Sequence, residues 1–204
     1  RTLLVGVGRY QIPGSDLPGI DKDIRMMREL VRLIGFNDSQ VKVLKDSRAT
    51  LKGIERAFEN HLIRGVSRND RVLFYFSGHG SQIPDRNGDE QDKWDEVLVP
   101  HDARGKNGTL VNAFQDDRFN EILSRIPARE IFVLIDACHS GSATKGFGNI
   151  GNGEVSKFLY YKGMPRKGFS PEASGESFTP DETSHEEKYV ALSACQDDET
   201  ALAT

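Results

Sequence analysis

Two residues with reactive side chains directly follow two apolar segments of the sequence. Val72–Phe76 leads into Ser-Gly-His79-Gly, and Ile131–Ile135 leads into Asp-Ala-Cys138. An imidazole beside a thiol lowers the pKa of the thiol, and it can then protonate the leaving amine. If the two segments are neighbouring strands, His79 and Cys138 form a nucleophilic pair for acyl transfer, which on a peptide is proteolysis.

The surroundings of this pair favour the same chemistry. The backbone N–H groups of Gly80 and Cys138 could hold the oxyanion of a tetrahedral intermediate. By itself, a histidine in a glycine-rich turn or a buried cysteine is more often structural, but their joint occurrence at two strand ends favours catalysis. A zinc site is the other alternative, although His79, Cys138 and His139 lack the paired close spacing of zinc ligands, and Cys195 stands apart.

Five short runs rich in β-branched and aromatic residues predict the strands of the domain. The two that precede His79 and Cys138 are almost continuously apolar, as in strands buried on both faces of a parallel sheet. Ligands bind beyond the carboxyl ends of such strands. The predicted strands are Leu3–Val7, Val41–Leu44, Val72–Phe76, Ile131–Ile135 and Tyr189–Leu192.

Amphipathic segments between these strands predict helices. One apolar stripe ends near Gly35, a second begins after the capping residue Thr50, and a third closes at Pro127. Strand–helix alternation predicts a three-layer α/β domain, with a mainly parallel sheet and helices on both faces. Two polar stretches interrupt this pattern: 80–112, with one short strand at Glu96–Val99 between turn pairs, and 142–187, which shows no periodicity.

Length and composition describe an ordinary globular domain. The 204 residues fit one hydrophobic core, and the net charge of −4 gives no support for a nucleic-acid partner. No apolar run approaches the ~20 residues of a membrane-spanning helix. Two cysteines make no disulfide framework, which predicts a reducing, cytoplasmic compartment. Since the sequence opens inside an apolar strand without Met, we expect an excised domain.

The two reactive segments resemble the signatures of metacaspases, whose bacterial members are called orthocaspases. The matching runs are Tyr75–Gly80 and, 59 residues after His79, the run centred on Cys138. The segments Leu17–Asp23 and Ser193–Thr200 are similar to further parts of that family. The resemblance implies a caspase-like fold, His79 and Cys138 as the catalytic pair, and no organic cofactor.

The resemblance also implies the specificity pocket. By position, Asp23, Ser77 and Asp136 would form its wall. Two carboxylates at one rim repel each other unless a cation lies between them, and an Arg side chain can pair with both. We therefore expect cleavage after Arg or Lys.

Calcium binding is less clearly indicated. Calcium-dependent members of the family use acidic residues that match Asp95, Asp116 and Asp117. A further family Asp aligns with Lys145, whose charge would repel the metal ion. We therefore expect no metal, and these three carboxylates as the ligands if calcium does bind.

The resemblance divides the single domain into three parts. Residues 1–141 would be a large-subunit-like catalytic region, 142–187 a flexible processing linker, and 188–204 the start of a truncated small-subunit-like region. An enzyme specific for basic residues is expected to cut its own linker and so to activate a zymogen. The linker's basic residues are Lys145, Lys157, Lys162, Arg166 and Lys167, of which Lys162, Arg166 and Lys167 are the candidate sites.

We therefore predict a monomeric cysteine endopeptidase that acts on peptides and proteins with Arg or Lys before the scissile bond. The alternative is a non-proteolytic caspase-like scaffold or signalling module. The presence of both His79 and Cys138 argues against that alternative, because a binding module needs neither.

Overall fold

A five-stranded parallel sheet forms the centre of the computed structural model, which describes residues 1–88, 93–138, 155–162, 164, 189–193 and 202–203. The strand order is β11-β9-β3-β1-β2, and every neighbouring pair is parallel. All five predicted strands are confirmed, each within one residue at either end. They are β1 (Thr2–Gly6), β2 (Val41–Lys45), β3 (Arg71–Ser77), β9 (Glu130–Asp136) and β11 (Tyr189–Ser193).

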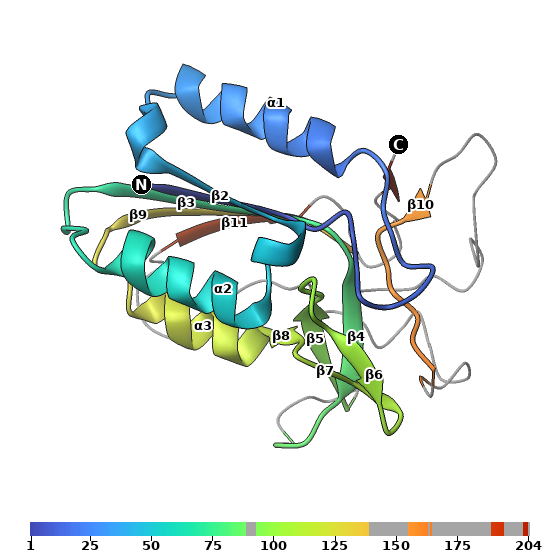
Figure 1. Cartoon of the computed structure of the whole chain (residues 1–204). Helices are drawn as coiled ribbons and strands as arrows, with labels where there is room; N and C mark the ends of the chain where they lie inside the picture. Colours follow the sequence, from blue (N-terminus) through green and yellow to red (C-terminus); the bar gives the residue numbers. More distant parts are fainter. Residues whose placement is uncertain (89–92, 139–154, 163, 165–188, 194–201, 204) are drawn as a thin grey trace.

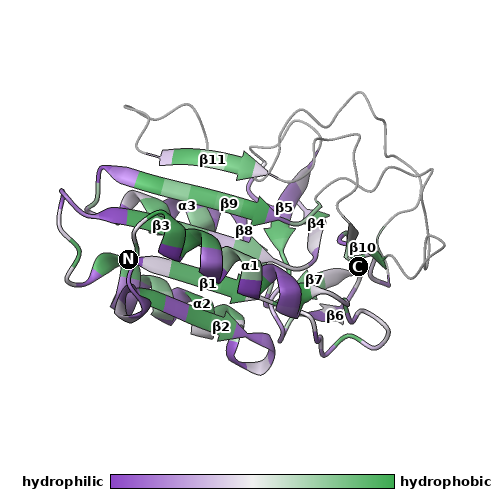
Figure 2. Cartoon of the chain, turned by 90° about the horizontal axis from the view of Figure 1, so that it is seen from above, coloured by the Kyte–Doolittle hydropathy of each residue, from purple (hydrophilic) through white to green (hydrophobic). Residues whose placement is uncertain are grey.

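Helices cover both faces of this sheet, as the sequence predicts (Figure 1). Helix α1 (Ile20–Leu33) lies on one face. Helices α2 (Leu51–Ala57) and α3 (Asp116–Ser124) lie on the other, and α2 continues as a π-helical segment, η3 (Phe58–Ile63). The strands between these layers are largely apolar (Figure 2). The result is a three-layer α/β domain with a mostly parallel sheet.

Local signals account for the helix ends. The Thr50 hydroxyl accepts a hydrogen bond from the Gly53 N–H at 3.0 Å and caps α2, as predicted. Gly35, just beyond α1, has the left-handed φ of 99° that favours glycine. The third helix ends at Ser124, before Pro127, because the Arg125 N–H bonds to the carbonyl three residues back and tightens the last turn.

An aromatic cluster holds β3 against the helices on one face. Phe74 of β3 lies 4.8 Å from Phe58 and 5.3 Å from Phe119 between ring centroids, and Phe114 lies 5.6 Å from Phe119. All four side chains are fully buried or nearly so. Such pairs contribute roughly 0.5–1.5 kcal/mol each beyond the burial of their area. The cluster therefore fixes the strand whose end carries the candidate histidine.

Short strands flank the carboxyl ends of the parallel strands. The prediction of a single strand in 80–112 was incomplete, because brief polar strands show no hydrophobic alternation. Asn107 and Gly108, at the predicted turn, both have positive φ (52° and 77°), as a tight hairpin requires. The additional elements are η1 (Asp38–Gln40), η2 (Asp46–Arg48), β4 (Gly80–Pro84), β5 (Trp94–Leu98), β6 (Arg104–Lys106), β7 (Thr109–Val111), β8 (Phe114–Gln115), β10 (Val155–Ser156) and β12 (Leu202–Ala203).

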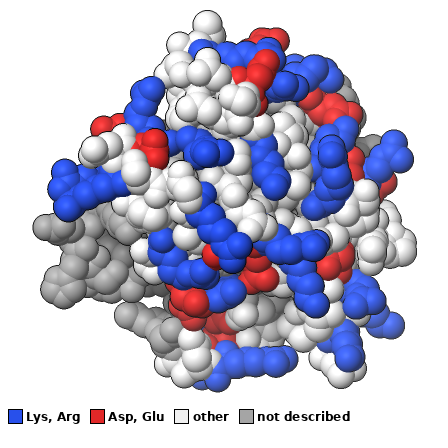
Figure 3. Space-filling view, turned by 60° about the vertical axis from the view of Figure 1, so that its left-hand side comes forward, with Lys and Arg blue, Asp and Glu red and all other residues white. Residues whose placement is uncertain are grey.

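The surface mixes charges of both signs. Figure 3, in which the left-hand side of Figure 1 comes forward, shows acidic side chains interspersed among the basic ones. On this face no extended area is purely basic, in line with the net charge of −4. Among the described residues, no helix is long and apolar enough to cross a membrane.

Candidate active site

Strands β3 and β9 are neighbours, so they bring the two reactive residues to one edge of the sheet. Ser77 pairs with Asp136 at the ends of the strands, and His79 and Cys138 each lie two residues beyond that pair. The Gly78 N–H donates to the Asp136 carbonyl at 3.3 Å, which keeps the two chain segments together past the strands. Both His79 and Cys138 are buried.

The imidazole of His79 is held in one orientation. Its Nε2 lies 2.8 Å from the backbone carbonyl oxygen of Ser15. Because a carbonyl oxygen only accepts hydrogen bonds, Nε2 carries the proton and Nδ1 carries the lone pair of the neutral ring. No described residue hydrogen-bonds Nδ1, and the backbone groups of Ser15 and then Lys157 act to raise the pKa of the ring. Burial dominates and lowers the pKa of His79 to about 4.

Tyr10 contacts both the backbone and the ring of His79. Its hydroxyl accepts the His79 backbone N–H at 2.7 Å, and the two rings lie 4.9 Å apart. A Cβ at Gly78 would lie 2.8 Å from the Tyr10 hydroxyl oxygen, so this glycine makes room for the contact. Sequence reasoning missed Tyr10 and Ser15. The only signal for this contact in the sequence was the glycine before the histidine.

Three polar residues lie close together beside this pair. Asp23 lies in the first turn of α1, whereas Ser77 and Asp136 end β3 and β9. The Ser77 hydroxyl donates to Asp23 at 2.8 Å, and the Tyr75 hydroxyl donates to Asp136 at 3.2 Å. Burial, followed by the negative charge of Asp136, raises the pKa of Tyr75, which therefore stays a donor. The residues implied as a specificity pocket thus lie together.

The ammonium group of a lysine of the same chain lies among these three residues. The Lys157 Nζ lies 2.7 Å from an Asp136 carboxylate oxygen, 3.1 Å from one of Asp23 and 3.1 Å from the Ser77 hydroxyl. Its side chain is 2% exposed, against 24% for Asp136 and 26% for Asp23. One cation therefore sits between two carboxylates that would otherwise repel each other. The sequence analysis did not single out Lys157 from the other basic residues of 142–187.

The backbone of the same lysine contacts the reactive pair. Its carbonyl oxygen accepts the Gly80 N–H at 2.9 Å and the Cys138 N–H at 3.4 Å. These are the two N–H groups that the sequence suggested for an oxyanion. Both donors therefore converge on one carbonyl, whose carbon lies at the edge of the sheet beside the reactive residues.

The residues around Lys157 are extended along the site. Val155 and Ser156 form β10, which pairs antiparallel with β12. After the lysine, Phe158 bridges to Gly80, and the Leu159 N–H donates to the Gly80 carbonyl at 2.9 Å. The Leu159 carbonyl in turn accepts the Ser81 hydroxyl at 2.8 Å. The segment is thus held on both sides of the lysine.

The acidic residues considered for calcium lie near one another. Burial, together with the nearby charges of Asp117 and Asp95, raises the pKa of Asp116 to about 6. Asp95 accepts a hydrogen bond from Gln115 at 2.8 Å, and Asp117 accepts one from Asn87 at 2.9 Å. Within the described ranges, no group of three His, Cys, Asp or Glu residues could hold a metal ion. The expectation that no calcium binds depends on Lys145, which lies outside those ranges, so it stays a prediction.

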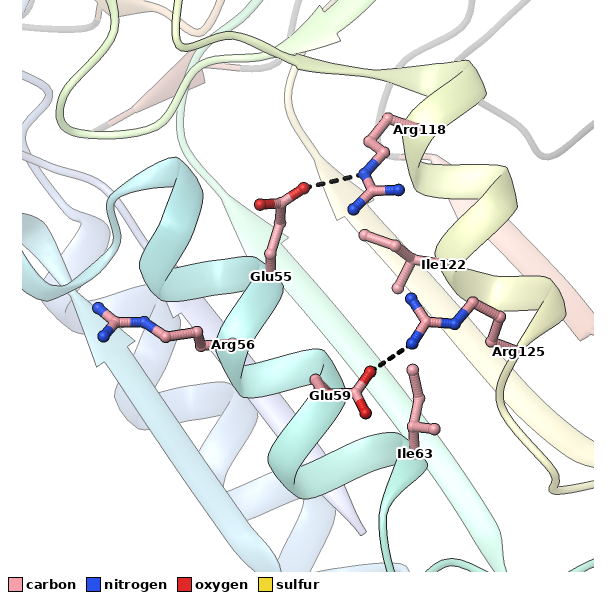
Figure 4. A pocket seen from close by; sticks show the side chains of 7 residues that line it. All are labelled: Glu55, Arg56, Glu59, Ile63, Arg118, Ile122 and Arg125. Carbon is pink, nitrogen blue, oxygen red and sulfur yellow. Dashed lines mark hydrogen bonds and ion pairs between the residues drawn. The ribbon is translucent and has the colours of Figure 1, made fainter.

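A hollow lies between α2–η3 and α3, away from the reactive pair (Figure 4). Glu55 pairs with Arg118 and Glu59 pairs with Arg125 across it. These two ion pairs join the helices across the hollow, whereas Arg56, which also lines it, donates to the Lys52 carbonyl at 3.2 Å. Of the other predicted residues, Lys162 is described and exposed, whereas Arg166, Lys167 and Cys195 lie outside the described residues.

Comparisons with known proteins are consistent with this geometry. A sequence profile described as a caspase domain matches residues 1–204. Metacaspase-1 of Eremothecium gossypii is 33% identical over 152 residues, covering 70% of this chain and 32% of that protein. Metacaspase-3 of Arabidopsis thaliana is 36% identical over 153 residues, covering 70% and 40%. The chain thus spans about a third of the length of such curated relatives.

A solved structure also has a similar fold. A protein from Geobacter sulfurreducens superimposes with a TM-score of 0.56 and 25% sequence identity. The match covers 71% of this chain and 52% of that one.

Proposed function

The chain belongs to the caspase domain family, and we propose that it is a cysteine endopeptidase that hydrolyses peptide bonds after Arg or Lys. One observation carries this proposal: Lys157 has its ammonium group between Asp23 and Asp136 while its carbonyl oxygen accepts the N–H groups of Gly80 and Cys138. A basic residue therefore fits the pocket and the oxyanion donors at the same time.

In this mechanism the Cys138 thiol transfers its proton to Nδ1 of His79, and the sulfur attacks the carbonyl carbon. The bond from Nε2–H to the Ser15 carbonyl supports this assignment, because it leaves Nδ1 as the ring's basic atom. Burial holds the pKa of His79 at about 4, so the ring is neutral at pH 7 and can accept the proton. The resulting imidazolium then protonates the leaving amine.

The oxyanion would be stabilised by the N–H groups of Gly80 and Cys138. In the described state these two donors already hold a carbonyl oxygen at 2.9 and 3.4 Å. Donors that are fixed before the reaction lower the barrier without reorganising, and the loss of one typically costs about 10²–10³ in kcat.

The specificity follows from the pocket's charge. Two carboxylates and a hydroxyl surround the lysine ammonium, and an Asp-ending peptide would place a third carboxylate among them. Arg is expected to be cleaved faster than Lys, because its planar fork can pair with both carboxylates. We further propose that the chain activates itself by cutting within 142–187, which is rich in basic residues.

Fluorogenic peptides ending in Arg, Lys or Asp test this function. We expect hydrolysis of the Arg and Lys peptides, none of the Asp peptide, and loss of turnover in Cys138→Ala and His79→Ala. Wild-type turnover in Cys138→Ala, or a preference for Asp, would show that the proposed function is wrong.

A further inference from the structure

Asp46 follows the last residue of β2, and its side chain binds the loop that supports the candidate histidine. Resting on the proposed function, we infer that Asp46 is a positioning residue for the reaction: its carboxylate fixes residues 8–17, the loop from which Tyr10 and Ser15 hold His79. Asp46 thereby acts through the loop and not on the reacting atoms.

One carboxylate oxygen of Asp46 binds two successive backbone groups at the start of this loop. Its Oδ1 accepts the N–H groups of Gly8 and Arg9, each at 2.9 Å. Hydrogen bonds to an ionised acceptor are about twice as strong as those between neutral groups. The side chain of Asp46 is only 20% exposed, which limits the competition from water. The carboxylate therefore holds the base of the loop in place.

The backbone of Asp46 is in a conformation that few residues other than glycine adopt. Its φ is 47°, in the left-handed region, which Asp and Asn enter more readily than most other residues. Such conformations persist where the surrounding structure requires them, and they are frequent at functional sites. Here the left-handed residue is the one whose carboxylate reaches across 38 positions of sequence to Gly8.

An ion pair with Lys45 is the structural alternative, and it explains only part of this geometry. The Lys45 Nζ lies 3.8 Å from Oδ2 of Asp46 and closer to a carboxylate oxygen of Asp21. The oxygen that faces the lysine is thus Oδ2, whereas Oδ1 faces the loop. A partly exposed pair of this length contributes little to stability. The bonds to the loop therefore give the better account of the carboxylate's position.

The next two backbone groups of the loop are held in the same manner. The Tyr10 N–H donates to Oδ1 of Asp16 at 2.9 Å, and the N–H that follows donates to the His101 carbonyl at 3.1 Å. The four successive N–H groups of residues 8–11 therefore all have acceptors, and Asp46 supplies the acceptor for two of them.

The loop contacts the candidate histidine at two points. The Tyr10 hydroxyl accepts the His79 backbone N–H at 2.7 Å, and the Ser15 carbonyl accepts Nε2–H at 2.8 Å. The Leu17 N–H closes the loop on the Gly8 carbonyl at 2.8 Å, so both contacts lie on a loop whose base the carboxylate binds. A loop that shifts would leave the imidazole free to turn, and a misplacement of about 1 Å can cost about 10²-fold in rate.

Two substitutions of Asp46 separate its hydrogen bonds from its charge and its backbone conformation. Asp46→Gly tolerates the left-handed backbone but removes the acceptor, whereas Asp46→Asn keeps an acceptor oxygen and removes the charge. Asp70→Gly is the matched control, because Asp70 accepts the Ser67 N–H at 2.6 Å just before the start of β3, at the other end from His79.

The kinetics of Arg-peptide hydrolysis provide the first measurement. In Asp46→Gly, kcat should fall about 10- to 100-fold while KM stays within about twofold, because the imidazole and not the substrate loses its position. Asp46→Asn and Asp70→Gly should stay within about threefold of wild type in both constants.

Histidine NMR tests the positioning without any turnover. In neutral solution the wild-type His79 ring should carry its proton on Nε2, and its signal is identified by its absence in His79→Gln. Asp46→Gly should show a mixture of the two tautomers, whereas Asp46→Asn and Asp70→Gly should keep the wild-type signal. The wild-type spectrum needs no substitution of Asp46. A wild-type ring protonated on Nδ1 therefore overturns the inference even if Asp46→Gly does not fold.

Failure of this inference is distinguishable from failure of the proposed function. Wild-type kcat in folded Asp46→Gly, an equal loss in Asp46→Asn, or a change in KM alone overturns the inference and leaves the function standing. If wild type hydrolyses no basic peptide, the proposed function is wrong, and the tautomer spectra then decide by themselves whether Asp46 positions His79.

Discussion

Replacing Asp136 by Asn tests the pocket most sharply, because it removes one charge and keeps the shape. The Lys157 Nζ lies 2.7 Å from Asp136 and 3.1 Å from Asp23, so Asp136 is the nearer partner. Removing one partner of a buried ion pair costs about 3–5 kcal/mol. Since 24% of the Asp136 side chain remains exposed, solvent screens the pair. We therefore expect about 2–3 kcal/mol, which is about 30- to 150-fold in kcat/KM for Arg and Lys peptides.

The assay compares three variants. Each is first incubated until its intact mass no longer changes, so that any self-cleavage is complete before activity is measured. Asp23→Asn should lose less than Asp136→Asn, about 5- to 30-fold, because its contact is longer and Ser77 also bonds to it. Asp21→Asn is the matched control: it lies in the same first turn of α1 but pairs with Lys45 at the surface, and should keep wild-type activity. A peptide ending in Met should be hydrolysed equally slowly by all. If Asp136→Asn stays within about twofold of Asp21→Asn on basic peptides, the pocket assignment is wrong.

Three further predictions concern the support of the site. Gly78→Ala should lower the free energy of unfolding by about 1–3 kcal/mol in a denaturant titration, because its Cβ would lie 2.8 Å from the Tyr10 hydroxyl oxygen. Gly105→Ala is the control and should be neutral, because a Cβ there has no atom within 4 Å. His79 is protonated in the unfolded but not the folded chain between its folded pKa of about 4 and the usual 6.5. Relative to His79→Gln, wild type should therefore lose about 3 kcal/mol of stability as the pH drops through that window, and this comparison cancels the opposite contribution of Asp116, whose folded pKa is raised to about 6. Because Lys145 replaces an expected acidic ligand, activity should be equal in excess chelator and in millimolar calcium, and a reversible activation by calcium would contradict this.

The sequence predicted the parts of the site that lie on regular elements. Val72–Phe76 and Ile131–Ile135 are apolar runs typical of buried strands, and their pairing as neighbours in the structure brings His79 and Cys138 to one edge of the sheet. Tyr10 and Ser15 could not be predicted, because they act through a hydroxyl and a backbone carbonyl in a loop without periodicity. The role of Lys157 was equally hidden, since it depends on a partner in α1 that lies far away in sequence.

The short strands were missed for a related reason. β4 and β10 contain few apolar residues, so they show no hydrophobic pattern although each pairs with a neighbouring strand through its backbone. Binding sites built from added strands are therefore poorly visible in a hydrophobic pattern, even where the candidate reactive residues stand out in the sequence.

Covalent labelling with a peptide chloromethyl ketone ending in Arg tests the central claim most directly, because it reports the nucleophile and the pocket together. The reagent should add one peptide to the processed enzyme, and peptide mapping should place it on Cys138, with no adduct from the Asp-ending reagent. Labelling of Cys195 instead, or equal labelling by both reagents, would contradict the account.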